Sequence, residues 1–172
     1  MFMKQVLKYI LSQVTQSLHF AESKHNISIT LSSAIIVFAA TQLSNFTLLG
    51  AVFSSIAITF CAISIFCSFF ALTSKRVILF RNSGSSKNAR NLLFYLDITK
   101  FDEATFIERV VKDYSLPKSY KADGFDFDLA HQIIATSKVA RSKFRLFNLA
   151  LFCLAVAIAF VVTSIIVSQV LK

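Results

Sequence analysis

Four basic residues are the side chains of this sequence with the clearest potential to bind a ligand. Lys138, Arg141 and Arg145 are spaced three and four residues apart, so a helix would place them on one face. Cations gathered in this way bind phosphates through charge-assisted hydrogen bonds. Arg90 lies in a separate part of the chain and is the expected opposite side of such a site. We therefore predict an anion-binding site at these four residues, although their spacing alone does not identify the anion.

The same basic cluster has two simpler explanations. Lys and Arg beside a membrane span orient that span, because cytoplasmic segments carry an excess of positive residues. They also attract anionic lipid headgroups. Both explanations remain open alongside ligand binding.

Catalytic and metal-binding patterns are missing from the sequence. It contains no GxSxG, HExxH, P-loop or GxGxxG motif. Asp123, Asp126 and Asp128 alternate somewhat as in a calcium loop, but the loop glycine and the terminal glutamate are absent. We expect instead that Asp126 or Asp128 begins the last helix, where the helix dipole favours acids. We predict that the protein is not an enzyme and has neither a metal site nor a cofactor.

Composition indicates an integral membrane protein. The chain has 172 residues, of which 55% are hydrophobic, and a mean hydropathy of +0.65. Of the 18 Lys and Arg residues, 14 lie between Ser74 and Leu146. This distribution explains the net charge of +9 by membrane orientation rather than by nucleic-acid binding. We expect the N-terminus and residues 74–146 to be cytoplasmic and the C-terminus to lie outside.

Hydropathy and periodicity predict an all-α fold with three transmembrane helices. Residues 1–26 form an amphipathic helix, because Met3, Leu7, Ile10 and Val14 follow helical spacing. Residues 27–73 form a transmembrane hairpin with spans at about 27–43 and 48–72. A basic cytoplasmic helical segment, 74–146, precedes a third span at 147–172. No Pro or Gly follows position 129, so nothing interrupts the last helix at the membrane.

Small side chains recur on one face of two predicted spans. Such faces allow close helix packing, and they could instead line a pore between assembled copies. Glu22 and Lys24 lie at the mouth of the first span, where charged side chains usually reach the interface or pair locally. The residues of the packing or pore face are Ser54, Ala57, Cys61, Ser64, Ser68, Ala150, Cys153 and Ala157.

Several segments resemble the Pycsar effector family of bacterial transmembrane effectors, which is similar in layout to the SLATT class. One of the two most specific segments is Asn91-Leu92-Leu93-Phe94 together with Asp97-Ile98. The other is the helix that begins with Leu129-Ala130 and Gln132-Ile133 and continues to Arg141 and Lys143-Phe144-Arg145-Leu146. Phe106-Ile107-Glu108-Arg109 lies between them. The resemblance extends from about Ala21 to Phe160. It is weaker at Ala21-Glu22-Ser23-Lys24, because the family usually has Asp where this chain has Glu22.

The resemblance implies a function that composition does not. Pycsar effectors act in anti-phage defence: a partner cyclase makes cyclic CMP or cyclic UMP, and the effector then impairs the bacterial inner membrane as an oligomer, causing abortive infection. On this basis Arg90, Lys138, Arg141 and Arg145 become candidate nucleotide-binding residues. The alternative is a membrane adaptor without a signalling role that binds a soluble partner through its cytoplasmic helices.

Overall fold

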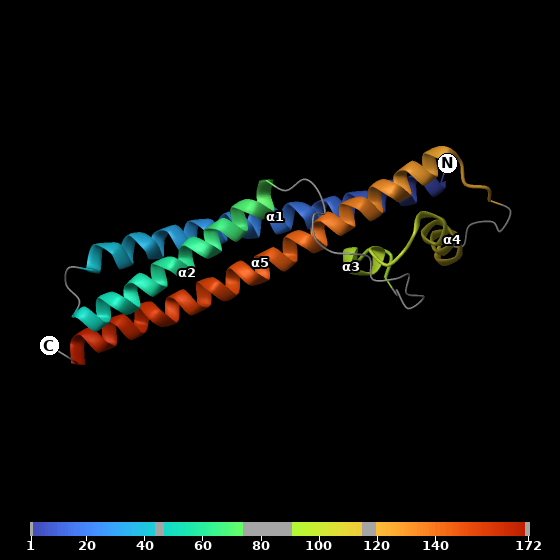
Figure 1. The fold of residues 1–172 in the computed structure, drawn as a ribbon. Helices are drawn as coiled ribbons and strands as arrows, with labels where there is room; N and C mark the ends of the chain where they lie inside the picture. The colour runs from blue at the N-terminus through green and yellow to red at the C-terminus, as the bar shows by residue number, and fades with distance from the viewer. Residues whose placement is uncertain (1, 44–46, 74–90, 115–119, 171–172) are drawn as a thin grey trace. The chain divides into compact units, whose positions relative to one another are not determined.

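The computed structural model of the chain describes residues 2–43, 47–73, 91–114 and 120–170. Over these residues it is all-helical, as predicted, and contains no strand. The described residues form five helices, and α1 and α5, labelled in Figure 1, are by far the longest. In chain order the helices are α1 (Phe2–Gln42), α2 (Leu48–Thr73), α3 (Tyr95–Ile98), α4 (Glu103–Asp113) and α5 (Gly124–Val170).

The two long helices contain no internal helix breaker. The first glycine of the chain is Gly50, and the single proline, Pro117, lies outside the described residues. The predicted amphipathic helix and the predicted first span are therefore one continuous helix, α1. In the same way, the cytoplasmic helix and the third predicted span together form α5. Gly124 is the first residue of α5 and so does not interrupt it.

The chain forms two compact units, and α1 and α5 contribute to both. The first unit consists of Met1–Ala21 and Lys75–Lys143, and the second consists of Glu22–Ser74 and Phe144–Lys172. The predicted division into four parts remains a prediction, and the two units are described separately below.

Large apolar side chains form the core of the first unit. The apolar stripe of α1 packs against α4 and the first part of α5, and Phe106 and Ile133 are completely buried. Burying one such side chain contributes about 1.5–3 kcal/mol. The amphipathic face of α1 is thus covered by protein. The buried core residues are Met3, Val6, Leu7, Ile10, Val14, Leu92, Ile98, Phe106, Ile107, Val110, Leu129, Ala130, Ile133 and Ile134.

The start of α5 differs from the prediction. The helix begins at Gly124, before both Asp126 and Asp128. Asp123 is the reason: its Oδ1 accepts a hydrogen bond from the backbone N–H of Asp126 at 3.0 Å, and Asp126 Oδ2 accepts from the N–H of Asp123 at 3.2 Å. This reciprocal pair is a capping box with an aspartate in place of the usual glutamate. Asp126 therefore belongs to the first turn and does not begin the helix.

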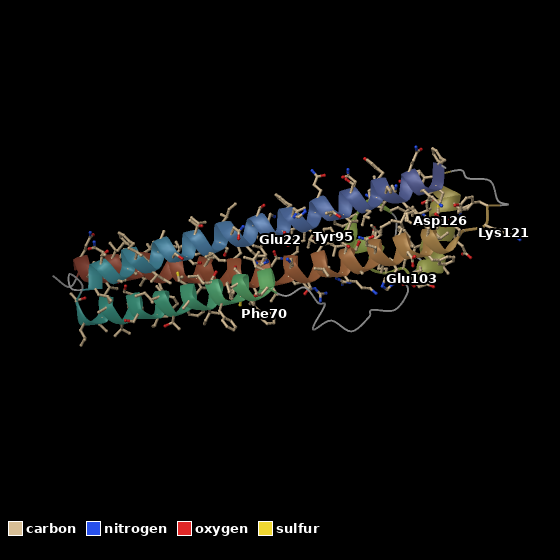
Figure 2. The ribbon with its side chains drawn as sticks, turned by 90° about the horizontal axis from the view of Figure 1, so that it is seen from above. Glu22, Phe70, Tyr95, Glu103, Lys121 and Asp126 are labelled. Carbon is tan, nitrogen blue, oxygen red and sulfur yellow. The ribbon has the colours of Figure 1, made fainter. Side chains whose placement is uncertain are left out.

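Polar contacts tie the start of α1 to the start of α5. Lys4 Nζ lies 2.8 Å from Asp123 Oδ2 and 5.0 Å from the centroid of the Phe125 ring. The hydrogen bond from Lys4 lowers the pKa of the Asp123 carboxyl. Asp126, labelled in Figure 2, is completely buried, and the hydroxyl of Tyr120 donates to its Oδ2 at 2.6 Å. These contacts place an ionic and a buried polar interaction at one end of the first unit.

The second unit has the opposite distribution of side-chain size. Its interior contains small residues, and its surface carries large apolar ones such as Phe66 and Phe152, which are 70% and 64% exposed. Such an arrangement suits a lipid environment, in which close backbone approach replaces a hydrophobic core. The buried residues of α2 are Gly50, Ser54, Ala57, Cys61, Ser64, Ser68 and Ala71.

Two of the described helices are long and apolar enough to cross a membrane. They are α2 and the long helix α5, whose most apolar windows have mean hydropathies of 2.2 and 2.9. The predicted first span, 27–43, is not one of them. It forms the second half of α1 and is close to the minimum length for a span.

We predict that Tyr120→Phe destabilises the protein in a pH-dependent way. The hydrogen bond to Asp126 raises the pKa of Tyr120 from 10.0 to about 12. Because the folded pKa is the higher one, the stabilisation is complete below pH 10 and is lost as the pH rises through about 12. At pH 7 the free energy of unfolding should fall by about 1.5–3 kcal/mol, the usual value for a hydrogen bond to a charged group.

The measurement is the thermal midpoint of the detergent-solubilised chain between pH 7 and pH 12. The difference from the wild type should shrink at the alkaline end of this range. Tyr9→Phe is the matched control, because the Tyr9 side chain is 54% exposed. Equal midpoints for the Tyr120→Phe variant and the wild type at pH 7 would contradict the role assigned to this hydrogen bond.

Candidate ligand-binding site

Residues 91–100 fold into a compact turn followed by α3. Asn91 begins the turn: its Oδ1 accepts from the N–H of Leu93 at 2.8 Å, and its own N–H donates to Asp97 Oδ2 at 3.3 Å. Lys100 Nζ lies 2.6 Å from the other oxygen of Asp97. Ile98 is completely buried and anchors α3 in the core. The segment with the Asn-Leu-Leu-Phe and Asp-Ile pattern thus builds a defined surface beside α5.

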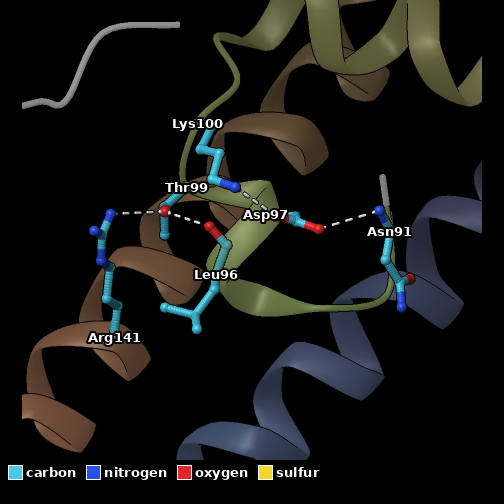
Figure 3. A network of polar contacts seen from close by, with 6 residues as sticks. All are labelled: Asn91, Leu96, Asp97, Thr99, Lys100 and Arg141. Atoms are coloured by element: carbon cyan, nitrogen blue, oxygen red, sulfur yellow. Dashed lines mark hydrogen bonds and ion pairs between the residues drawn. The ribbon is translucent and has the colours of Figure 1, made fainter. Parts of the chain in front are cut away.

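Arg141 reaches this surface from α5. Its Nη1 donates a hydrogen bond to Thr99 Oγ1 at 3.2 Å, and the Thr99 hydroxyl donates to the carbonyl oxygen of Leu96 at 2.8 Å (Figure 3). Tyr95 is also close: burial raises the pKa of its hydroxyl, and the positive charge of Arg141 partly opposes this effect. Arg141 is half-buried. The guanidinium is therefore held in place by a neutral hydroxyl group.

Arg141 has no carboxylate partner within the described part of the chain. Asp97, on the same surface, is engaged by Lys100 and by the Asn91 N–H. A guanidinium carries five N–H donors, and only one bond to the described residues is seen here. A half-buried cation without a counter-charge is a favourable position for an anionic ligand, which would supply both charge and hydrogen-bond acceptors.

The structure says less about the roles of the other three predicted cations. Lys138 is half-buried, one turn before Arg141 in the first unit. The hydrogen bond with His131 is the main cause that lowers the pKa of Glu103, and the charge of Lys138 adds a smaller effect. Arg145, one turn after Arg141, is exposed and belongs to the second unit. Arg90 lies outside the described residues. Arg141, by contrast, contacts the surface formed by α3 through its hydrogen bond to Thr99.

Thr99, Tyr95 and Lys100 were not predicted as site residues. Thr99 and Lys100 directly follow the Asp-Ile pair that carries the resemblance, and this adjacency was the available signal in the sequence. Which face of α3 turns toward Arg141 depends on tertiary packing. Thr99 is buried, and only the folded chain places its hydroxyl within reach of a residue 42 positions later.

Lys24, at the mouth of the first predicted span, lies against aromatic rings. Lys24 Nζ lies 5.5 Å and 5.3 Å from the ring centroids of Phe144 and Phe147 of α5, within cation–π range. His25 is completely buried and meets the Phe147 ring edge-on at 5.7 Å. Glu22 is half-buried. In the second unit, these contacts join α1 to α5.

All eight predicted packing or pore-face residues are buried within the second unit: Ser54, Ala57, Cys61, Ser64, Ser68, Ala150, Cys153 and Ala157. Ser64 is central among them. Its hydroxyl donates to the carbonyl oxygen of Ala150 at 2.9 Å and lies 3.3 Å and 3.2 Å from the hydroxyls of Ser28 and Ser32. The small faces therefore lie between the helices of a single chain.

Groups of acidic, His and Cys side chains that could hold a metal ion are absent from the residues that the structure describes. The nearest approach to a catalytic pair is His131 Nδ1 and Glu103 Oε1, 2.9 Å apart. His131 is exposed, and its bond to Glu103 connects α5 to α4.

Comparison with known proteins gives one family. A family model described as the Pycsar effector protein domain matches residues 6–168 and thus covers nearly all of α1 and α5. This match confirms the resemblance seen in the sequence. No curated protein and no solved structure matches the chain.

We predict that Asp97→Ala loosens the turn that carries Thr99. The substitution removes the acceptors of the Asn91 N–H and of Lys100. Since a hydrogen bond to a charged group contributes about 1.5–3 kcal/mol, amide exchange over residues 91–100 should become about tenfold faster or more. Hydrogen exchange read by mass spectrometry measures this rate, with exposed Glu108→Ala as the control. Unchanged exchange would show that Asp97 does not stabilise the turn.

Proposed function

The chain belongs to the Pycsar effector family, and from this premise we propose that it is an anti-phage effector of the bacterial inner membrane. A cyclic nucleotide second messenger such as cyclic CMP or cyclic UMP, made by a partner cyclase, binds the first unit. The membrane-spanning part, as an oligomer, then impairs the membrane by forming a pore or by general disruption. The family that the chain belongs to is one of membrane effectors and not a known enzyme family.

The position of Arg141 is the observation that carries the proposal. Its half-buried guanidinium is held by Thr99 and faces no carboxylate among the described residues. A nucleotide phosphate would supply the missing negative charge, and its oxygens match the fork of guanidinium donors. Tyr95 and the rest of the α3 surface lie beside this position, where an aromatic ring can contact a base or a sugar. Lys138, Arg145 and Arg90 remain candidates for further contacts.

Helix α5 directly connects the proposed ligand-binding residue Arg141 to the apolar segment that would cross the membrane. Arg141 and the apolar residues that follow it belong to one unbroken helix, Gly124–Val170. A helix of this length spans about 70 Å at 1.5 Å per residue, roughly twice the hydrocarbon thickness of a bilayer. Movement of Arg141 toward a phosphate is thereby transmitted along α5. The ligand shifts the equilibrium by the difference between its affinities for the resting and active arrangements.

We further propose that α1 supplies a third span. From Ile27 onward it turns small residues such as Ser28 and Ser32 inward and large apolar ones such as Leu31 and Val37 outward, as α2 does. The concentration of Lys and Arg between Ser74 and Leu146 supports a cytoplasmic N-terminus and middle segment. The C-terminus then lies on the outer side.

We predict that Arg141→Ala weakens the response to the nucleotide. Loss of a charge-assisted contact costs about 1.5–3 kcal/mol, so the nucleotide dose for half-maximal depolarisation should rise by about tenfold to a hundredfold. The chain is expressed with its cyclase, and membrane potential is followed with a voltage-sensitive dye. Lys112→Ala is the matched control, because it removes an exposed positive charge from α4.

Two outcomes would contradict different parts of the proposal. An unchanged dose for Arg141→Ala, with insertion at the wild-type level, would exclude Arg141 from the site. Failure of the wild-type chain to depolarise cells that contain active cyclase would exclude the effector function itself. In that case, retained binding of a soluble partner to the first unit would favour the adaptor alternative.

A further inference from the structure

We propose that the serine-rich interior of the second unit becomes the water-contacting surface of the active state. Helices within one protomer separate, and the hydroxyl and carbonyl oxygens between them then bind water and small monovalent ions. The inference rests on the proposed membrane-impairing function and specifies which surface carries out that function. The interior serines are Ser28, Ser32, Ser54, Ser64, Ser68 and Ser164, all buried.

Five of the six interior serines form hydrogen bonds between helices. Ser64 of α2 contacts both Ser28 and Ser32 of α1 and donates to the Ala150 carbonyl of α5. Two further bonds repeat this pattern: Ser54 donates to the Ala39 carbonyl at 3.3 Å, and Ser164 donates to the Gly50 carbonyl at 2.7 Å. Separation of the helices breaks every one of these bonds.

Hydroxyl groups on the outer surface behave differently. Ser55, Thr59 and Thr163 are exposed, and each donates to a carbonyl four residues earlier in its own helix, at 2.9–3.0 Å. These bonds are independent of neighbouring helices. The outer hydroxyls therefore keep their bonds whatever the helices do, whereas the interior hydroxyls that bond between helices lose their present partners when the helices separate.

Ser68 is a second and independent observation that indicates that the interior can hold water. It lies one turn beyond Ser64 on the same face of α2 and is completely buried. Its hydroxyl has no hydrogen-bond partner within the described residues. A buried hydroxyl of this kind is a favourable place for a water molecule.

The two kinds of surface differ in what they can contact after the helices move. Opened into lipid, the interior serines lose the bonds that join the helices, and donation back to their own helix, as at Ser55, replaces only part of this bonding, which leaves a free-energy cost. Water removes this cost. The outer surface, with side chains such as Phe66 and Phe152, offers water no comparable set of partners. Helix separation and water entry are thus coupled by the same hydrogen bonds.

The native cysteines provide a direct test. Cys61 and Cys153 are buried among the interior serines. In a Cys67→Ser chain in sealed membrane vesicles, both should resist a charged methanethiosulfonate reagent at rest and react about tenfold faster or more once the vesicles leak. A thiol on the outer surface is the control, introduced as Ile63→Cys in a chain without other cysteines, since Ile63 is 44% exposed. It should stay unreactive in both states because it faces lipid.

A matched pair of substitutions tests the same idea without any nucleotide. Ala57→Leu adds bulk to the buried face of α2, where overpacking favours helix separation, whereas Ala62→Leu adds the same bulk to the exposed face. We expect about a tenfold rise in spontaneous dye leakage for Ala57→Leu and none for Ala62→Leu. Immunoblotting of carbonate-washed membranes confirms that both variants insert equally.

The outcomes separate this inference from the proposed function. The inference is supported if Cys61 and Cys153 react with the reagent when the vesicles leak. It is overturned if the vesicles leak while both of these thiols stay protected and the thiol of Ile63→Cys reacts. Leakage by Ala57→Leu, without any response of the wild type to nucleotides, overturns the nucleotide trigger and supports the inference. A third outcome is that the nucleotide induces leakage while both thiols stay protected, and that a fully inserted Ala57→Leu chain does not leak. This outcome overturns the inference and leaves the nucleotide trigger intact.

Discussion

The constraint on which the structure depends is that a helix in lipid must satisfy its backbone hydrogen bonds internally. Helix α5, which is apolar enough to cross a membrane, meets it by extending through both units without an internal glycine or proline, and α1 is unbroken in the same way. An unbroken helix is stiff, and its backbone needs no partner from outside. The same property that allows α5 to enter a membrane also makes it a suitable element to carry the movement of Arg141.

Along each long helix, the size of the buried side chains changes from one unit to the other. In the first unit α1 and α5 bury large side chains such as Leu7 and Ile133, and in the second unit they bury small ones such as Ser32 and Ala157. Water favours the burial of large apolar side chains, whereas lipid gives no such preference and rewards close backbone contact. The change in buried residue size is the one that a change from water to lipid along each helix would produce.

Polar groups also divide into two functional classes. The buried serines of the second unit bond across helices, and the exposed hydroxyls bond within their own helix. In the first unit, Arg141 bonds to the Thr99 hydroxyl rather than to a carboxylate. Alongside the ion pair of Lys4 with Asp123, both units thus contain contacts between elements that are neutral or incompletely satisfied. Such contacts can be exchanged for a ligand or for water at modest cost, as a two-state membrane effector requires.

The sequence by itself determined the helical class and the small-residue faces of α2 and α5, because periodicity and the absence of breakers are local properties. Only the tertiary structure decided that Asp123 caps α5, that Thr99 meets Arg141 and that Ser64 joins three helices. Asp123 competed with Asp126 and Asp128 for the same role, and local spacing could not distinguish them. The other contacts join residues 32 to 86 positions apart, so packing between helices sets their geometry and no local pattern encodes it.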